Sequence, residues 1–122
     1  MEGFSVSPGR ARGLHVLEVV GELDIATAPE LTEAVAAAVL AATADGTPLV
    51  LDLTLCTFLD SSGSRAVGMA AREGDREGVL VSLVSPPSVT AVRRVVDHVG
   101  LSAVMAVHDD LDAALTGGPA VR

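Results

Sequence analysis

The amino-acid sequence predicts an α/β fold with a mostly parallel central sheet, an N-terminal antiparallel strand pair and about four helices. Short apolar runs rich in Val and Leu, typical of buried strands, alternate along the chain with stretches of helical periodicity. Strands that alternate with helices require parallel pairing and right-handed crossovers. Glycines at positions 9 and 13 separate the first two strand-like runs and favour a hairpin there. The 122 residues suffice for one domain with its own core.

The first two strands are predicted at residues 4–7 and 14–20. The first run alternates apolar and polar side chains, and we expect Pro8-Gly9 to end it. The second run is the stronger one because most of its side chains are apolar. His15 lies in this run without another His or Cys at metal-ligand spacing, so we interpret it as a surface or half-exposed residue.

A first helix is predicted to begin after Thr27. Thr27 and Glu30 have the three-residue spacing of a capping box, and Pro29 lies in the first turn, where its missing N–H does no harm. Asp45-Gly46 is expected to end the helix. The side chains that the helical spacing assigns to the buried face are Leu31, Val35, Ala38, Val39 and Ala42.

Residues 49–74 are predicted to run from a buried strand through a short loop into a second helix. The strand, residues 49–53, is an apolar run interrupted only by Asp52, typical of a strand covered on both faces. The helix opens on residues 60–63, Asp-Ser-Ser-Gly; Ser and Asp are preferred N-cap residues because their side chains accept hydrogen bonds from unpaired N–H groups. A helix start also favours anions, so a phosphate on one of these serines would be tolerated.

The spacing within this second helix predicts two faces. One face is expected to lie against the sheet and carries the small or apolar residues Gly63, Val67, Ala70 and Gly74. The other face is expected to stay open to a partner and carries Ser61, Arg65, Gly68 and Arg72. The helix is predicted to end near Gly74 or Gly78.

A strand and a third helix are predicted next. Residues 79–84 form an apolar run broken only by Ser82, which is typical of a buried strand. A rigid Ser-Pro-Pro-Ser turn follows, and its last residue, Ser88, is expected to cap a helix over 89–99 that Gly100 closes. The side chains that we expect to face inward are Val89, Val92, Val96 and Val99.

The C-terminal part of the chain is predicted to add a short strand at 103–107 and a short helix capped by Asp109 or Asp110. Residues 117–122 contain Gly-Gly-Pro and are expected to form a disordered tail. The single domain is therefore placed at residues 1–116, with no internal repeat and no linker before the tail.

Charge and composition argue against nucleic acid and membranes as partners. Sixteen acidic and eight basic residues give a formal net charge of -8, whereas affinity for phosphate backbones comes from Lys and Arg. Aromatic residues make up 2% of the chain, and neither Trp nor Tyr is present to stack on bases. No apolar run reaches the ~20 residues of a membrane helix, and the N-terminus lacks a signal-peptide pattern. We therefore expect a cytoplasmic protein.

The residue types that carry catalysis or hold metals form no known pattern in this chain. Cys56 is the single cysteine, so no disulfide forms within the chain, and we interpret it as a small buried hydrophobe. No P-loop pattern is present, the serines lack the G-x-S-x-G elbow, and capping or solvation explains His98 and His108. A hydrolase stays an open alternative, since the three histidines could lie anywhere in space. The sequence favours a protein that is not an enzyme and predicts no metal and no cofactor.

Two phrases of the sequence resemble the STAS-domain anti-sigma factor antagonist family. Phe58 to Gly63, FLDSSG, follows a hydrophobic strand and resembles the phosphorylation segment of these small proteins. Val20 to Asp24, VGELD, with the downstream Ala26, Ala28, Pro29 and Leu31, resembles the segment between their second strand and first helix. The resemblance extends from about residue 4 to residue 115 and implies a single STAS-like domain.

The resemblance also implies a function by partner switching. In this family an unphosphorylated antagonist binds an anti-sigma factor and frees the sigma factor; the anti-sigma factor, an ATP-dependent kinase, phosphorylates the serine after the Asp, and a phosphatase reverses the reaction. Carried over, that serine is Ser61, with Ser62 as the fallback. The residues that would line the docking surface are Glu22, Asp24, Asp60 and Gly63.

One departure from the family pattern concerns the two residues after Gly63. The family usually continues with an apolar and a small residue, whereas this chain has Ser64 and Arg65, which removes a plausible apolar anchor of the interface. Arg65 lies one helical turn from Ser61, where it can partly neutralise a phosphate, and belongs to the expected partner-binding residues. This departure keeps a second class of function open, a non-switching STAS scaffold or the accessory subunit of a transporter.

Overall fold

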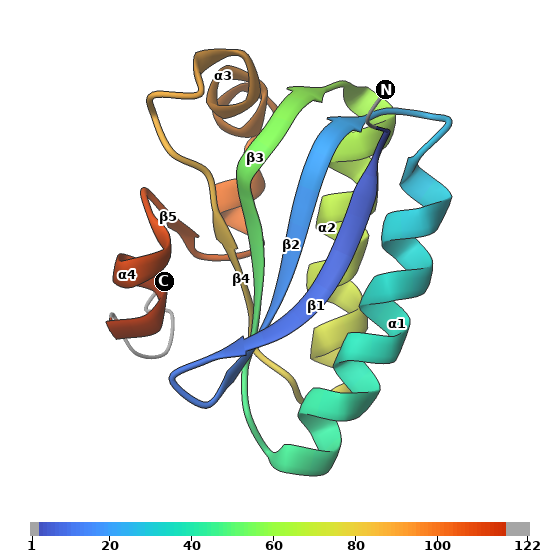
Figure 1. The fold of residues 1–122 in the computed structure, drawn as a ribbon, viewed down its shortest axis with the longest axis vertical. Helices are drawn as coiled ribbons and strands as arrows, with labels where there is room; N and C mark the ends of the chain where they lie inside the picture. The colour runs from blue at the N-terminus through green and yellow to red at the C-terminus, as the bar shows by residue number, and fades with distance from the viewer. Residues whose placement is uncertain (1–2, 117–122) are drawn as a thin grey trace.

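A mixed sheet of five strands in the order β1-β2-β3-β4-β5 is the frame of the computed structural model, which describes residues 3–116 (Figure 1). β1 pairs with β2 antiparallel, and all other pairs are parallel, which confirms the predicted fold class. The strands are β1 (Ser5–Ala11), β2 (Leu14–Leu23), β3 (Leu49–Leu59), β4 (Val81–Val84) and β5 (Val107–His108). The helices are α1 (Ala28–Asp45), α2 (Ser61–Glu77), α3 (Thr90–Val99), the short 3-10 helix η1 (Leu101–Ala103) and α4 (Leu111–Thr116).

Apolar side chains on both faces of the sheet form two cores. Since successive strand residues point to opposite faces, Leu49 and Leu51 of β3 join the large core under α1, α2 and α3, whereas Val50 joins a small core under α4. Figure 1 shows α1 and α2 side by side against one face of the sheet and α4 at the other side. The five side chains predicted to form the buried face of α1 are all buried, and so are the four predicted for α2.

The N-terminal hairpin differs from its prediction. β1 continues through Pro8-Gly9 to Ala11, and the chain turns at Arg12 and Gly13, which have positive φ angles of 50° and 84°. Pro8 is tolerated because β1 is an edge strand, where a backbone N–H is dispensable on the open side.

β3 is twice as long as the predicted strand, which was expected to give way to a loop after Leu53. The parallel ladder with β2 continues through the pairs Val20 with Leu55 and Leu23 with Leu59, across two register shifts. Pairing with a neighbouring strand therefore extends β3 through Thr54 and Thr57, which interrupt its apolar run. As a consequence the strand leads directly into Asp60 and α2, and the predicted loop does not exist.

Four predictions for the C-terminal half are corrected. β4 begins at Val81 because Val79 still donates a hydrogen bond to the Gly74 carbonyl at the end of α2. Val89 occupies the N-cap position of α3 without a side-chain cap, so Ser88 does not cap this helix, and Val99 is exposed. The strand predicted at 103–107 is reduced to β5, since the chain before it coils into η1.

The end of the described chain agrees with the prediction for α4. The Ala113 amide donates to Asp110 Oδ1 over 2.8 Å, so Asp110 is the residue that caps this short helix. The tail expected at 117–122 lies outside the described residues. Among the helices of residues 3–116, none has the length and apolar character needed to cross a membrane.

Candidate functional site

The two sequence segments that carry the family resemblance meet at one edge of the sheet, the edge formed by the carboxyl ends of β2 and β3. β2 and β3 are parallel and end together, with Leu23 paired to Leu59, so the residues that follow both strands lie at the same edge. β2 continues into Asp24 and α1, and β3 continues into Asp60 and α2. This edge is the top of the molecule in Figure 1, where α2 begins.

Asp60 is the residue that caps α2. Its side-chain Oδ1 accepts a hydrogen bond from the Gly63 amide over 2.9 Å, and its carbonyl oxygen accepts bonds from both the amide and the hydroxyl of Ser64, each 2.8 Å long. Ser61 is exposed and Ser62 is half-buried. Within residues 3–116, the Ser61 hydroxyl forms no hydrogen bond. The side-chain cap of α2 therefore does not involve the hydroxyl of the exposed Ser61.

Gly63 fixes the first turn of α2 against the end of β2. A Cβ atom at this position would lie 2.4 Å from the Leu23 carbonyl oxygen and 2.8 Å from Leu59 Cδ1. The helix can approach the strands this closely only because Gly63 has no side chain. Gly63 is buried, so its contribution to the site is to position Ser61.

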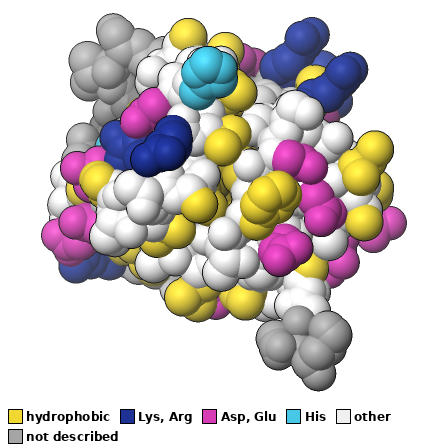
Figure 2. All heavy atoms as spheres, turned by 90° about the horizontal axis from the view of Figure 1, so that it is seen from above, with side chains coloured by type: hydrophobic (Ala, Val, Ile, Leu, Met, Phe, Trp, Pro, Cys, Tyr) yellow, Lys and Arg dark blue, Asp and Glu magenta, His cyan; other side chains and the backbone are white. Residues whose placement is uncertain are grey.

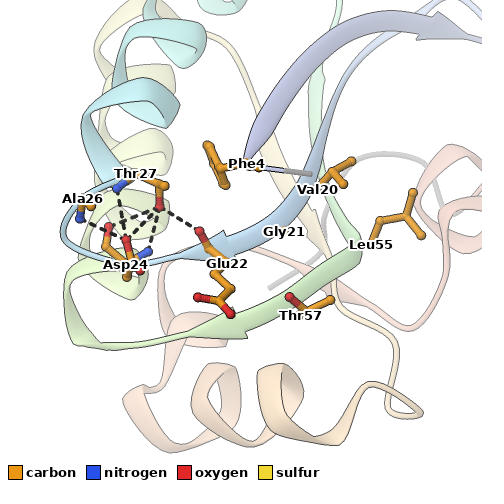
Figure 3. A pocket seen from close by; sticks show the side chains of 10 residues that line it. Phe4, Val20, Gly21, Glu22, Asp24, Ala26, Thr27, Leu55 and Thr57 are labelled. Atoms are coloured by element: carbon orange, nitrogen blue, oxygen red, sulfur yellow. Dashed lines mark hydrogen bonds between the residues drawn. The ribbon is translucent and has the colours of Figure 1, made fainter. Parts of the chain in front are cut away.

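The loop between β2 and α1 is held by Asp24. Its Oδ1 accepts hydrogen bonds from the amides of Ala26 (3.0 Å) and Thr27 (3.1 Å), while the Thr27 hydroxyl donates to the Glu22 carbonyl over 2.8 Å (Figure 3). The predicted capping box is wrong, since Thr27 makes no side-chain cap to α1 and Asp24 covers the preceding amides instead. Glu22, the second-last residue of β2, is exposed, and Asp24, which follows the strand, is half-buried.

Apolar side chains are exposed beside these acidic residues. Ile25 is 76% exposed, Leu55 50% and Phe58 44%. Leu55 also lines a hollow of about 480 Å³ together with Phe4 and Glu22, and in Figure 3 Leu55 lies on the other side of Gly21 from Glu22. Seen from above in Figure 2, this end of the molecule displays acidic and apolar side chains next to one another.

These exposed apolar residues were not among the predicted site residues. Their signal in the sequence was weak, because Leu55 and Phe58 lie in a stretch that was expected to be a loop. Three residues that were predicted, Glu22, Asp24 and Asp60, do come together at this edge. These acidic and apolar residues form a candidate docking surface, which we call the docking surface below: Glu22, Asp24, Ile25, Phe58, Asp60 and Ser61.

Comparison with known proteins identifies the family. The chain is 34% identical over 117 residues to the anti-sigma-F factor antagonist RsfB of Mycobacterium tuberculosis, an alignment that covers 95% of this chain and 90% of RsfB. A family model described as "Mlab, STAS domain" matches residues 8–107. The chain belongs to the STAS-domain anti-sigma factor antagonist family.

Solved structures of STAS-domain proteins have the same fold. An anti-sigma factor antagonist from Mycobacterium paratuberculosis is 30% identical and superposes with a TM-score of 0.77, covering 94% of this chain and 93% of its own. The Bacillus antagonist SpoIIAA in its unphosphorylated form is 20% identical, with a TM-score of 0.62 over 92% of this chain and 93% of its own. At this lower identity the likeness to SpoIIAA shows a shared fold.

The structure shows the surroundings of position 64, where this STAS domain departs from the usual family pattern. Ser64, which stands where the family usually has an apolar residue, is 4% exposed, and its hydroxyl is satisfied by the Asp60 carbonyl. The Ser64 side chain therefore offers little surface to a partner, although the residue lines the same hollow as Ser61 and Arg65. Arg65 is exposed on the same face of α2 as Ser61.

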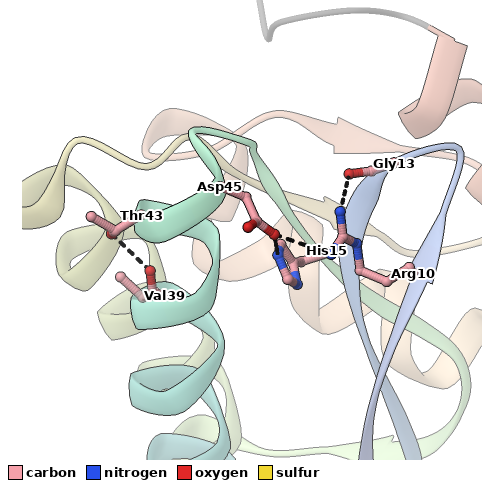
Figure 4. Close-up of polar contacts among 6 residues, drawn as sticks. All are labelled: Arg10, Gly13, His15, Val39, Thr43 and Asp45. Atoms are coloured by element: carbon pink, nitrogen blue, oxygen red, sulfur yellow. Dashed lines mark hydrogen bonds and ion pairs between the residues drawn. The ribbon is translucent and has the colours of Figure 1, made fainter.

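Two further polar residues of the STAS domain, Cys56 and His15, have structural roles. Cys56 is buried, as predicted; burial raises the pKa of its thiol, which donates to the Phe58 carbonyl. His15 lies at the opposite end of the sheet from Ser61, where its Nε2 is 2.7 Å from Asp45 Oδ2 (Figure 4). In the part of the chain that the structure describes, no three His, Cys, Asp or Glu side chains are grouped to hold a metal ion.

Proposed function

We propose that this protein is an anti-sigma factor antagonist that acts by partner switching, with Ser61 as the phosphorylated residue. In its unmodified form it binds an anti-sigma factor through the docking surface, and that partner, an ATP-dependent kinase, phosphorylates Ser61; a phosphatase restores the unmodified form. The observation that carries this proposal is an exposed serine hydroxyl at a helix start that the fold does not use, beside exposed Phe58 and Ile25. In this role the protein is the substrate of an enzyme.

The helix start tolerates a phosphate without loss of the fold. Asp60 caps the amide of Gly63, so modification of Ser61 disrupts no hydrogen bond of the cap. The positive end of the helix dipole favours a negative group in the first turn. We therefore expect phosphorylation to leave the structure intact and to act at the interface.

The same phosphate is unfavourable once the docking surface is covered. It carries about -1.5 to -2 charges at neutral pH, and Glu22, Asp24 and Asp60 gather at the same edge of the sheet. Burial of a phosphate against carboxylates and apolar side chains costs both desolvation and repulsion. Each ~1.4 kcal/mol lost weakens binding tenfold, so a few kcal/mol release the partner.

Burial supports Ser61 over Ser62 as the modified residue. Ser61 is exposed, whereas Ser62, the next residue of the same turn, is half-buried. A kinase must bring the hydroxyl into line with the γ-phosphate of ATP, which an exposed side chain allows without opening the helix.

The proposal is tested by incubation with a purified candidate anti-sigma factor and ATP, followed by intact-mass measurement. Wild type is expected to gain one phosphate, Ser61→Ala none, and the matched control Ser62→Ala one. A phosphate that is retained in Ser61→Ala would move the site to Ser62. If wild type binds the partner and gains no phosphate, the protein is a non-switching scaffold or a transporter accessory subunit, the alternative class that the sequence left open.

A further inference from the structure

A groove separates α2 from the segment formed by the end of α3 and η1. It begins beside Ser61, has a volume of about 540 Å³ and continues along the exposed face of α2. The side chains that carry the argument are Arg65, Met69, Arg72, Val99 and Val104. Gly68 also lines the groove, and its missing side chain keeps it open towards Leu101.

Apolar side chains that line this groove are exposed to solvent. Met69 is 48% exposed, Val99 45% and Val104 49%. They come from α2, the end of α3 and the residue after η1, so three separate segments turn an apolar side chain towards one hollow. Apolar residues that gather on one face in this way mark interaction sites more often than single exposed residues do.

The groove is basic although the chain is strongly acidic. Arg65 and Arg72 are the charged residues that line it, both are exposed, and neither takes part in an ion pair within residues 3–116. The arginines that do form ion pairs in this range are Arg10, Arg12, Arg76 and Arg93. On a chain with a net charge of -8, two unpaired guanidinium groups beside an apolar floor point to a partner with carboxylates.

From this geometry we infer that the groove receives an amphipathic helix of the anti-sigma factor, with apolar side chains on the groove floor and two acidic residues about seven apart that pair with Arg65 and Arg72. The two arginines are seven residues apart on one helix, a separation of about 10.5 Å along its axis, which equals one heptad of an aligned partner helix. This inference rests on the proposed function and specifies the chemistry of the partner.

The position of Arg65 connects the groove to phosphorylation. Ser61 and Arg65 are one turn apart on the same face of α2, within reach of a phosphate-guanidinium pair. Arg72 is eleven residues from Ser61, about 16 Å along the helix axis, and lies out of reach. A phosphate on Ser61 therefore competes with the partner's carboxylate for Arg65 and leaves Arg72 unaffected.

The test measures affinity for the purified kinase that phosphorylates the chain in the assay above. Arg65→Ala and Arg72→Ala are each expected to weaken binding about three- to tenfold, with a smaller effect at high salt. Arg94→Ala is the matched control, since Arg94 is exposed, has no ion pair in residues 3–116 and lies outside the groove, and it should bind within about twofold of wild type.

Repeating the affinity measurement in a Ser61→Asp background distinguishes the roles of Arg65 and Arg72. Arg72→Ala should weaken binding there as much as before, whereas Arg65→Ala should have little further effect. Wild-type affinity in Arg72→Ala, with phosphorylation of Ser61 intact, would overturn the groove assignment and leave the proposed function standing. A wild-type dimer that Arg72→Ala converts to monomer would also overturn it, because a second copy would then fill the groove.

Discussion

The first turn of α2 touches the end of β2: a Cβ atom on Gly63 would lie 2.4 Å from the Leu23 carbonyl oxygen. This contact joins the two segments that carry the family resemblance, because Leu23 leads into the Asp24 loop and Gly63 belongs to the helix that presents Ser61. The position of the exposed serine relative to Glu22 and Asp24 therefore depends on a glycine that no partner needs to touch.

Gly63→Ala is expected to lower the free energy of unfolding by about 2–3 kcal/mol, since the obstructing atom is a backbone carbonyl that cannot rotate away. The measurement is urea unfolding followed by circular dichroism. Gly68→Ala is the matched control in the same helix: its Cβ would lie 3.7 Å from Leu101 Cδ2, an ordinary contact, so stability should stay equal or rise by up to ~1 kcal/mol. Equal stability of wild type and Gly63→Ala would refute the close contact.

Ser61→Ala is expected to change the free energy of unfolding by less than about 0.5 kcal/mol, because Asp60 caps the helix. Asp60→Ala should cost about 1 kcal/mol, since it leaves the Gly63 amide without its acceptor. Thermal melting of Ser61→Ala and Asp60→Ala against wild type measures both effects. If Ser61→Ala is the more destabilised variant, Ser61 has a structural role, and the claim that its hydroxyl is unused by the fold is wrong.

Asp45 is expected to contribute to stability in a pH-dependent way. The hydrogen bond from His15 and the charge of Arg10 lower the pKa of Asp45 below its ordinary value of 3.8 (Figure 4). A lowered pKa in the folded state means that the contribution is present above about pH 4 and is lost as the pH falls through the lowered value. The stability difference between wild type and Asp45→Asn should therefore shrink below pH 4. Urea unfolding at pH 7, 5, 4 and 3 measures it; a difference that is constant over this range would contradict the interpretation.

Cys56 is expected to resist thiol reagents in the folded protein. Burial raises the pKa of its thiol, and the side chain is 0% exposed, so both the thiolate fraction and access are low. Labelling with a maleimide at pH 7.5 should be slow in native buffer and fast in denaturing urea. Rapid labelling of the native protein would show that the end of β3 opens readily.

The sequence predicted those features of the fold and site that depend on local spacing. The buried face of α1 from Leu31 to Ala42 and the two faces of α2 follow from helical periodicity alone, and both are confirmed. Asp60 at the start of α2 was likewise identifiable because a capping residue acts on amides of its own turn.

The features that the sequence could not supply depend on contacts between distant residues. β3 extends to Leu59 because β2 pairs with it, whereas in the sequence Thr54 and Thr57 interrupt the apolar run after Leu53. Thr27 and Glu30 have capping-box spacing, yet Thr27 makes no side-chain cap; instead the end of β2 brings the Asp24 carboxylate to the amides of Ala26 and Thr27, just before α1. The burial of the Ser64 side chain and its hydrogen bond to the Asp60 carbonyl also depend on the packing of α2, which a single-sequence pattern does not show.

The central claim, that phosphorylation acts at the interface and leaves the fold intact, is tested most directly on protein phosphorylated at Ser61. The dissociation constant for the anti-sigma factor and the melting temperature are measured on the same modified and unmodified samples. We predict binding at least about tenfold weaker after modification, with a melting temperature within about 3 °C of the unmodified protein or above it. Unchanged affinity, or a loss of affinity that is accompanied by a large fall in melting temperature, would contradict the account.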